Sequence, residues 1–266
     1  MGDNAQSADV TRHPALAHQW RHVALATVDS TQAEAMRRAL AGEPGPLWIT
    51  AEVQTLGRGR SGRAWSTPAG NLAATLLLRP LCEPVLLPQL SLVAGVAAID
   101  ALALCAGAAA GPTALRLKWP NDLMIGAAKL GGILVESSVL GGALVAAIGI
   151  GINIAEAPEV AGRAITRLAD HTTGAPTPQA LLAALAASMA ASLEVWSNGS
   201  GFAQIRAAWG ERALAEGSPI TVNAGAGPVS GSFAGLDIDG ALLLLAPDGR
   251  RRRFTWGDVT LAPVKV

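Results

Sequence analysis

One short segment combines arginines and glycines in a pattern suited to binding an anion. Three of each alternate and end at a tryptophan, in the order Gly57, Arg58, Gly59, Arg60, Gly62, Arg63 and Trp65. Glycine lets a backbone approach a ligand closely, and the planar guanidinium group binds pairs of phosphate oxygens. The segment therefore predicts a loop that closes over a phosphate-bearing ligand. The same composition also suits a loop that binds nucleic-acid backbone.

Three further motifs follow along the chain and narrow the choice. They are Lys118-Trp119-Pro120-Asn121-Asp122, the run Lys129-Leu130-Gly131-Gly132-Ile133-Leu134-Val135-Glu136, and Gly149-Ile150-Gly151-Ile152-Asn153-Ile154. In this order and at these spacings, they and the stretch from Gln54 to Trp65 resemble the motifs of biotin–protein ligases. The resemblance extends from about Thr27 to the C-terminus.

The resemblance implies a two-step reaction that consumes ATP. The carboxylate of biotin attacks the α-phosphate of ATP, which gives biotinyl-5′-AMP and pyrophosphate. A specific lysine of a biotin carboxyl carrier domain then attacks this anhydride and releases AMP. Because the first step brings an anion onto a polyanion, fixed cations are needed, and Mg²⁺ is expected on the phosphates. The implied partner is the biotin carboxyl carrier protein of acetyl-CoA carboxylase, and other biotin-dependent carboxylases stay open as acceptors.

The resemblance to biotin–protein ligases implies a role for each residue that matches one of the family's motifs. The residues expected to be catalytic are Arg60, Lys129 and Asp122. Those expected to bind biotin are Ser30, Thr31, Gln32, Gln54, Arg58, Gly59, Arg60, Lys129, Gly132 and Ile133. Those expected to bind the nucleotide are Arg58, Arg60, Arg63, Trp65, Asn121 and Asn153. No dedicated metal ligand is expected, because the four histidines form no cluster in the sequence.

Several positions leave alternatives open. Gln32 stands where relatives have asparagine, so it keeps the amide group and adds a methylene. Asp122 either orients or deprotonates the acceptor lysine, or serves only as a structural hydrogen-bonding group. Arg63 either binds the nucleotide or forms a simple salt bridge. The run from Arg250 to Arg253 has two possible roles. It either forms a solvated turn, or one of its arginines contacts the nucleotide or the acceptor domain.

Hydrophobic patterning predicts an α+β scaffold for these motifs. Strands are expected at residues 23–28, 47–53, 72–78, 115–119, 130–137 and 144–150, with a turn around Asn121, Asp122 and Gly126. Helices are expected at residues 32–40, capped by Asp29-Ser30-Thr31, at 90–105, ended by Gly107 and Gly111-Pro112, at 179–196 and at 202–214.

A change of pattern at Gly217 predicts a second, smaller unit. Short strands at residues 219–223, 228–236, 241–246 and 251–255 alternate with the turn signals Asp239-Gly240 and Asp248-Gly249. The expected organisation is an N-terminal arm at 1–22, a mixed-sheet catalytic domain of the biotin/lipoate ligase type at 23–216, and a small SH3-like β-barrel at 217–266.

Composition excludes several other classes. Half of the 266 residues are apolar, and twenty basic residues balance twenty acidic ones, which makes a non-catalytic nucleic-acid-binding module a poor fit. Too few residues precede the first ligase-like strand for a winged-helix domain, so no DNA binding or repressor activity is expected. Residues 90–110 are apolar but contain Asp100, which indicates a buried helix and no membrane span.

The remaining expectations concern the setting of the protein. The two cysteines are expected to be reduced thiols in a cytoplasmic protein. The chain is a monomer or a homodimer. The nearest alternative activity is a lipoate- or octanoate-attaching enzyme on a related fold, but such enzymes lack the Gly-Arg-Gly-Arg and Lys-Trp-Pro-Asn-Asp motifs present in this sequence.

Overall fold

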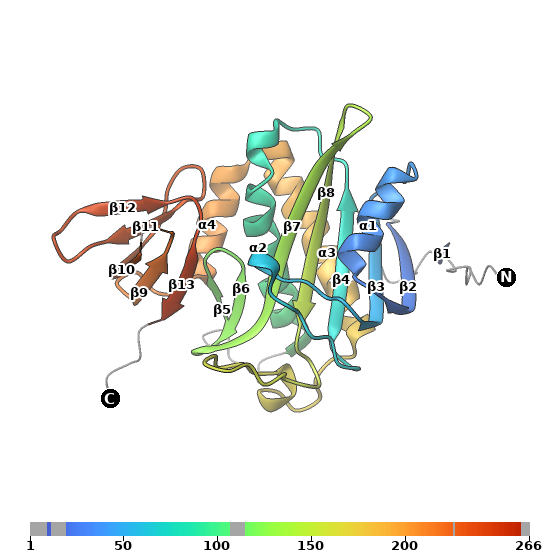
Figure 1. Cartoon of the computed structure of the whole chain (residues 1–266), viewed down its shortest axis with the longest axis horizontal. Helices are drawn as coiled ribbons and strands as arrows, with labels where there is room; N and C mark the ends of the chain where they lie inside the picture. Colours follow the sequence, from blue (N-terminus) through green and yellow to red (C-terminus); the bar gives the residue numbers. More distant parts are fainter. Residues whose placement is uncertain (1–9, 12–19, 107–114, 226, 262–266) are drawn as a thin grey trace.

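The chain folds around a mixed eight-stranded β-sheet (Figure 1). The computed structural model describes residues 10–11, 20–106, 115–225 and 227–261. The strand order is β1-β2-β3-β4-β8-β7-β6-β5, with β2 and β3 parallel and the other neighbours antiparallel. The strands are β1 (Val10–Thr11), β2 (Arg21–Val28), β3 (Leu47–Gln54), β4 (Leu72–Leu78), β5 (Leu115–Lys118), β6 (Asp122–Ile125), β7 (Ala128–Leu140) and β8 (Ala143–Ile152).

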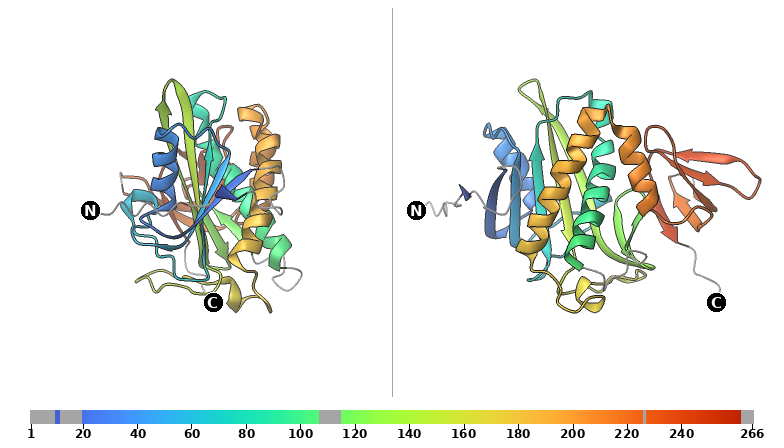
Figure 2. Two further views of the ribbon diagram at one scale, coloured as in Figure 1. Left: turned by 90° about the vertical axis from the view of Figure 1, so that its right-hand side faces the viewer. Right: turned by 180° about the vertical axis from the view of Figure 1, so that it is seen from behind.

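Helices cover the two faces of this sheet unequally. The single helix α1 (Thr31–Leu40) packs on one face, while α2 (Gln89–Ala106), α3 (Pro178–Trp196) and α4 (Phe202–Arg212) lie over the other (Figure 2). Successive residues of a strand alternate between these layers. Leu77 belongs to the hydrophobic cluster under α1, whereas Leu76 belongs to the cluster under α2 and α3. The short helical turns are η1 (Arg60–Gly62), η2 (Pro84–Leu86), η4 (Leu168–Asp170) and η5 (Ser197–Gly199).

Two segments are long and apolar enough to cross a membrane, residues 84–105 and 178–199. They contain α2 and α3, which pack against each other and against the sheet (Figure 2). Most of the first segment is buried within the fold, whereas less than half of the second is buried. Asp100, the charge that interrupts the first segment, forms an ion pair of 2.7 Å with Arg212 of α4.

The C-terminal unit is a five-stranded antiparallel sheet with the order β12-β11-β10-β9-β13. Its strands are β9 (Pro219–Asn223), β10 (Pro228–Leu236), β11 (Leu242–Leu245), β12 (Arg251–Phe254) and β13 (Asp258–Leu261). Its buried side chains join the core of the large sheet, and the indole N–H of Trp119 donates to the carbonyl of Gly240 at 3.1 Å. The two sheets therefore share one hydrophobic core.

Three strands were missed by the sequence pattern, namely β1, which lies within the expected N-terminal arm, β6 and β13. The predicted turn around Asp122 is wrong at this position, because Asp122 begins β6 and pairs with Lys118 of β5. The apolar run after Asp122 has only three residues, which is too short for periodicity to identify a strand. Strand β13 is similarly short. The predicted helix end at Gly107 and at residues 111–112 lies outside the described residues.

Candidate active site

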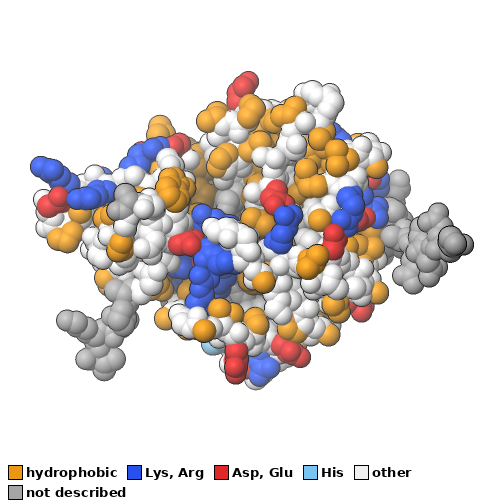
Figure 3. Space-filling model, in the orientation of Figure 1, with side chains coloured by type: hydrophobic (Ala, Val, Ile, Leu, Met, Phe, Trp, Pro, Cys, Tyr) orange, Lys and Arg blue, Asp and Glu red, His pale blue; other side chains and the backbone are white. Residues whose placement is uncertain are grey.

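A cavity of about 1150 Å³ opens on the face of the large sheet that carries α1. Its lining comes from the start of α1, from β3, β4, β5, β6, β7, β8 and β13 and from the loops between them, and it includes every site residue selected from the sequence. Lys and Arg side chains gather around this hollow near the C-terminal sheet (Figure 3). Pockets for one small molecule usually enclose roughly 300–1,000 Å³. The cavity is therefore large enough for two substrates side by side.

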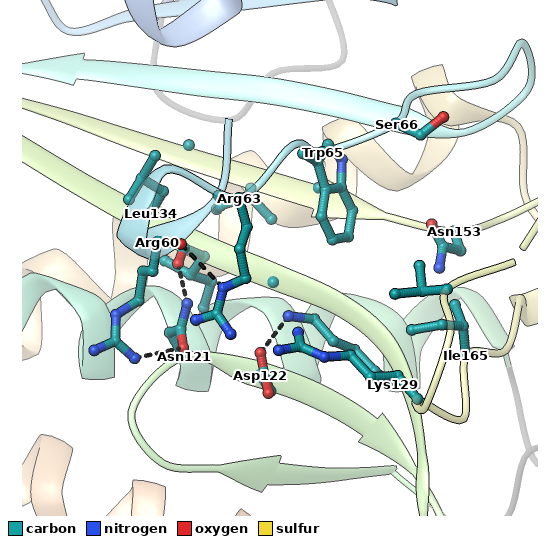
Figure 4. Close-up of a pocket in the computed structure, with 18 of the residues that line it drawn as sticks. Arg60, Arg63, Trp65, Ser66, Asn121, Asp122, Lys129, Leu134, Asn153 and Ile165 are labelled. Carbon is teal, nitrogen blue, oxygen red and sulfur yellow. Dashed lines mark hydrogen bonds and ion pairs between the residues drawn. The ribbon is translucent and has the colours of Figure 1, made fainter. Parts of the chain in front are cut away.

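The glycine–arginine loop, residues 54–65, is folded back on itself as a narrow hairpin. The amide of Trp65 donates to the carbonyl of Gly57 at 2.8 Å, and the amide of Gly59 donates to the carbonyl of Arg63 at 2.7 Å. Ser61 has a φ of 56°, so the tip turns through the left-handed region at a small residue. This turn brings the side chains of Arg60 and Arg63 to the same side of the loop (Figure 4).

Both arginines contact other parts of the cavity wall. Arg60 donates to the side-chain oxygen of Asn121 and to the carbonyl of Gly257, each at 3.3 Å. Arg63 forms an ion pair of 2.9 Å with Asp258 of β13. Burial lowers the pKa of the Arg60 guanidinium, which nevertheless stays charged at neutral pH. The loop therefore places two cations between the large sheet and the C-terminal sheet.

A carboxylate between two lysines forms the centre of the cavity. The pairing of β5 with β6 sets Lys118 opposite Asp122, and the two side chains are 2.8 Å apart. Lys129 reaches from β7 to the other carboxylate oxygen of Asp122 (Figure 4). Burial alone would raise the pKa of Asp122, but Lys129 and Lys118 outweigh it and hold that pKa below its ordinary value. Asp122 is therefore a weak base, which favours the structural alternative for this residue.

The ammonium group of Lys129 is surrounded by Gly132, Asp122 and the indole ring of Trp65. A Cβ atom on Gly132 would lie 3.1 Å from the ammonium nitrogen of Lys129, so glycine leaves room for this side chain. Burial lowers the pKa of Lys129, while Asp122 partly restores it. The ammonium nitrogen also lies 5.7 Å from the ring centroid of Trp65, within range of a cation–π interaction. Lys129 is thus a cation held by Asp122 and Trp65, and it lines the cavity.

The indole ring of Trp65 packs directly on the backbone of β8. A Cβ atom on Gly151 would approach atoms of the indole ring to 2.5 Å, closer than real side chains allow. Gly151 thus explains one glycine of the Gly149–Ile154 motif, because only glycine lets the ring lie flat against the strand.

Gly151→Ala is expected to displace Trp65 and so to weaken nucleotide binding about tenfold, since stacking on one aromatic side chain contributes about 1–3 kcal/mol. The fold should persist, because Trp65 belongs to the loop and can move outward. Titration of the variant with ATP, followed by tryptophan fluorescence, checks this expectation. Gly210→Ala lies in α4, outside the cavity lining, with a helical backbone and open space around its Cβ position, and serves as a control. Equal ATP affinities of wild-type protein and Gly151→Ala would contradict the expectation.

The opposite end of the cavity presents neutral hydrogen-bonding groups. The amide and the hydroxyl of Thr31 both donate to the side-chain oxygen of Gln54, at 2.9 and 3.1 Å. Thr75 of β4 donates to the hydroxyl of Thr31 at 2.8 Å. Ser30 is the N-cap residue of α1, as expected, and has an extended backbone, but its side-chain hydroxyl forms no capping hydrogen bond. Buried at the cavity wall, that hydroxyl can bind a ligand.

Gln32 is bound more firmly to the protein than the sequence suggested. Its side-chain amide donates to the carbonyls of Ala147 at 2.9 Å and Leu134 at 3.2 Å, which are on β8 and β7. The extra methylene relative to asparagine gives the amide this reach. Both of its hydrogens are used, so Gln32 can offer a ligand only its carbonyl oxygen. A Cβ atom on Gly149 would lie 2.4 Å from that oxygen, so the glycine makes room for it.

Asn153 carries an unused acceptor. Its side-chain nitrogen donates to the carbonyl of Thr166 at 3.1 Å, but its side-chain oxygen is buried and has no hydrogen-bond partner among the described residues. Leaving such an oxygen unsatisfied costs on the order of 1–3 kcal/mol. Because Asn153 lines the cavity, a ligand with an N–H group can supply the missing hydrogen bond.

Comparison with known proteins identifies the family. The Biotin/lipoate A/B protein ligase family matches residues 25–153, and the Biotin protein ligase C terminal domain matches residues 217–261. The biotin–[acetyl-CoA-carboxylase] ligase of Paracoccus denitrificans is 43% identical over 236 residues, which cover 85% of this chain and 95% of that protein. The chain belongs to the biotin protein ligase family.

Two further comparisons agree with this assignment. The bifunctional ligase/repressor of Escherichia coli is 33% identical over 89% of this chain and 73% of its own length. The structure of a biotin protein ligase from Aquifex aeolicus in complex with biotin and ATP has a TM-score of 0.76 and 27% identity, and the match covers 91% of this chain and 99% of that one. The expected fold class, a mixed-sheet ligase domain followed by a small β unit, is confirmed.

The structure adds residues of this ligase that sequence reasoning did not select. Lys118, Arg163 and Asp258 line the cavity and carry charge. Lys118 is part of a recognised motif, but Arg163 and Asp258 lie in segments without any motif signal. None of the described cavity-lining residues comes from 250–253. Arg253 instead pairs with Asp237 and Asp239 at an exposed edge of the C-terminal sheet.

The described part of this ligase offers no metal site of its own, so a Mg²⁺ ion would be held mainly by the phosphates of ATP. The described residues contain no group of three His, Cys, Asp or Glu side chains able to hold a metal ion. The carboxylates of Asp122 and Asp258 are paired with lysine and arginine. Mg²⁺ commonly binds through phosphates and water with few protein ligands, so the expected ion would enter with the nucleotide.

Proposed function

We propose that this ligase joins biotin to ATP in the cavity and then passes the biotinyl group to a lysine of a carrier domain. One observation carries the proposal. A single cavity combines an end with neutral hydrogen-bonding groups and an end where six lysine and arginine side chains face three carboxylates. The first end suits a neutral ring with a short apolar chain, and the second suits a polyphosphate.

In this proposal, biotin binds with its ureido ring at the neutral end. Ser30 and Thr31 hydrogen-bond the ring, and Gln32 contributes an acceptor for a ring N–H group. Gln54 holds the hydroxyl of Thr31 in place. The apolar chain of biotin then runs along Gly132 and Ile133, and its carboxylate lies between Lys129 and the backbone of Arg58 and Gly59.

ATP binds across the cationic end. The indole ring of Trp65 covers the adenylate, and the free oxygen of Asn153 accepts a hydrogen bond from the amino group of adenine. The phosphates lie near Arg58, Arg60, Arg63 and Lys129, and Asn121 orients Arg60. Mg²⁺ supplies further neutralisation of the phosphates when it is bound.

The first step forms one bond and breaks one. An oxygen of the biotin carboxylate attacks the α-phosphorus, the bond to the β-phosphate oxygen breaks, and the electron pair leaves with pyrophosphate. Arg60 and Lys129 face the charge that builds on the α-phosphate, and Asp122 positions Lys129. In the second step, the neutral amine of the acceptor lysine attacks the carbonyl carbon, the bond from this carbon to the phosphate oxygen breaks, AMP leaves with the electron pair, and the nitrogen gives up one proton to solvent. The folded loop limits access of water to the anhydride.

The proposal also names the acceptor protein, the cellular compartment and the absence of specific DNA binding. The acceptor is the biotin carboxyl carrier protein of acetyl-CoA carboxylase, in keeping with the name of the Paracoccus relative. We expect the reaction to take place in the cytoplasm. We expect no sequence-specific DNA binding, because twenty basic and twenty acidic residues leave no net charge to attract DNA.

The proposal is tested with the purified protein, biotin, ATP, Mg²⁺ and a carrier domain. Mass spectrometry should show that the carrier gains one biotinyl group, and only when all components are present. A carrier whose acceptor lysine is replaced by arginine controls for chemical acylation of surface amines. Lipoate in place of biotin tests the related activity. Failure to modify the carrier, or equal use of lipoate, would refute the proposal.

A further inference from the structure

Arg163 lies on the segment 153–167, which connects β8 to η4 and contributes to the lining of the cavity. The backbone of this segment is held against β7. The amide of Lys129 donates to the carbonyl of Ala164, and the amide of Thr166 donates to the carbonyl of Lys129, both at 2.9 Å. Arg163 therefore lies in the chain directly before a backbone connection to the central lysine, and it lines the cavity.

Arg163 differs from the other cations of the cavity in having no partner. The others have hydrogen bonds or ion pairs, namely Arg58 with Glu136, Arg60 with Asn121, Arg63 with Asp258, and Lys118 and Lys129 with Asp122. The guanidinium of Arg163 has neither with any residue in the described parts of the chain. Its five N–H donors are thus available to a ligand.

The pKa values of two neighbouring residues, Lys129 and Asp258, show that the guanidinium of Arg163 lies near both of them. Burial is the main cause that lowers the pKa of Lys129, and Arg163 lowers it further. Burial alone would raise the pKa of Asp258, but three surrounding arginines, including Arg163, hold it below its ordinary value. Arg163 is therefore close enough to act on the central lysine and on the carboxylate of β13. One carboxylate facing three guanidinium groups leaves an excess of positive charge between them.

This excess charge suits the part of ATP that leaves in the first step. With the α-phosphate at Lys129, the β- and γ-phosphates extend toward the region between Arg63 and Arg163. We infer that Arg163 binds the β- and γ-phosphates and neutralises the leaving pyrophosphate. The inference rests on the proposed function and assigns one further substrate-binding residue to it. As the bond between the α-phosphorus and the bridging oxygen breaks, that oxygen gains negative charge, and a guanidinium there stabilises it.

The test separates the two half-reactions. Adenylation is measured as biotin-dependent pyrophosphate release, and transfer is measured with supplied biotinyl-5′-AMP and the carrier domain, where no pyrophosphate is involved. Arg163→Ala should lower kcat/KM for ATP in adenylation by on the order of 10²-fold, and inorganic pyrophosphate should inhibit it more weakly. Transfer should change less than about twofold, and Arg163→Lys should recover part of the loss, because it keeps the charge without the bidentate geometry.

Arg167→Ala is the matched control on the same segment. Its guanidinium is already engaged with Asp170 and with the carbonyl of Ala155, at 2.9 and 2.8 Å, so adenylation should stay near wild type. An Arg163→Ala variant that matches this control would overturn the inference, and so would an equal loss in both half-reactions, which indicates a general structural role. If the wild-type protein forms no biotinyl-5′-AMP at all, both the proposed function and this inference are refuted.

Discussion

Replacing Lys129 or Arg60 by alanine is expected to slow the formation of biotinyl-5′-AMP by on the order of 10²-fold or more. Fixed charges that face the reacting atoms contribute this much to other reactions of the same kind. Lys129 lies between Asp122 and the indole ring of Trp65, and Arg60 is held by Asn121 and Gly257, so neither needs to reorganise during the step. Single-turnover pyrophosphate release with saturating biotin and ATP measures the rate.

The fold should survive both substitutions. Asp122 keeps Lys118 as a counter-ion in Lys129→Ala, and Asp258 keeps Arg63 in Arg60→Ala. Circular dichroism and thermal unfolding verify that the variants are folded. Lys129→Arg should retain part of the rate because it retains the charge. An alanine variant that adenylates biotin at a near-wild-type rate would remove that residue from the mechanism.

Asp122→Asn is expected to reduce both stability and adenylation. The substitution leaves two partly buried ammonium groups without their shared carboxylate, and because breaking a fully buried ion pair from one side costs about 3–5 kcal/mol, the loss here should be smaller, about 1–3 kcal/mol. Lys129 then also loses the carboxylate that partly restores its pKa against burial, so it holds its proton less firmly. Denaturant unfolding and pyrophosphate release measure the two effects. Asp100→Asn, which breaks the more exposed pair with Arg212, should cost less than about 1 kcal/mol.

The pH dependence of stability gives an independent check on Asp122. Its pKa is lowered in the folded state, so its contribution is complete above the ordinary carboxyl range near pH 4 and is lost as the pH falls through the lower folded-state pKa. The stability difference between wild type and Asp122→Asn should therefore shrink in acid. The alternative role as a base predicts a different pattern, in which only transfer from supplied biotinyl-5′-AMP slows and stability is unchanged.

The part of the site carried by contiguous motifs was predictable from the sequence. Arg60, Trp65 and Lys129 belong to runs in which residue type and spacing are both informative, and all three line the cavity. The mixed sheet and its main helices were also predictable, because continuous apolar runs marked the core strands and the helices α2 and α3, and α1 has a clear amphipathic pattern.

Other parts depend on contacts between distant segments. Asp258 starts a four-residue strand and meets Arg63 only because the two sheets pack together. Arg163 lies in an irregular segment and reaches the cavity through backbone bonds around Lys129. The contacts of Gln32 depend on the separation of α1 from β7 and β8, which no local pattern encodes. Such residues have no signal in one sequence.

The most direct test of the central claim omits the acceptor. In the presence of biotin, ATP and Mg²⁺, a cavity that binds both substrates and shields the anhydride should release one equivalent of pyrophosphate per active site and then stop. Biotinyl-5′-AMP should remain bound to the protein, and added carrier domain should consume it. Pyrophosphate release that does not depend on biotin, or that continues without an acceptor, would contradict the account.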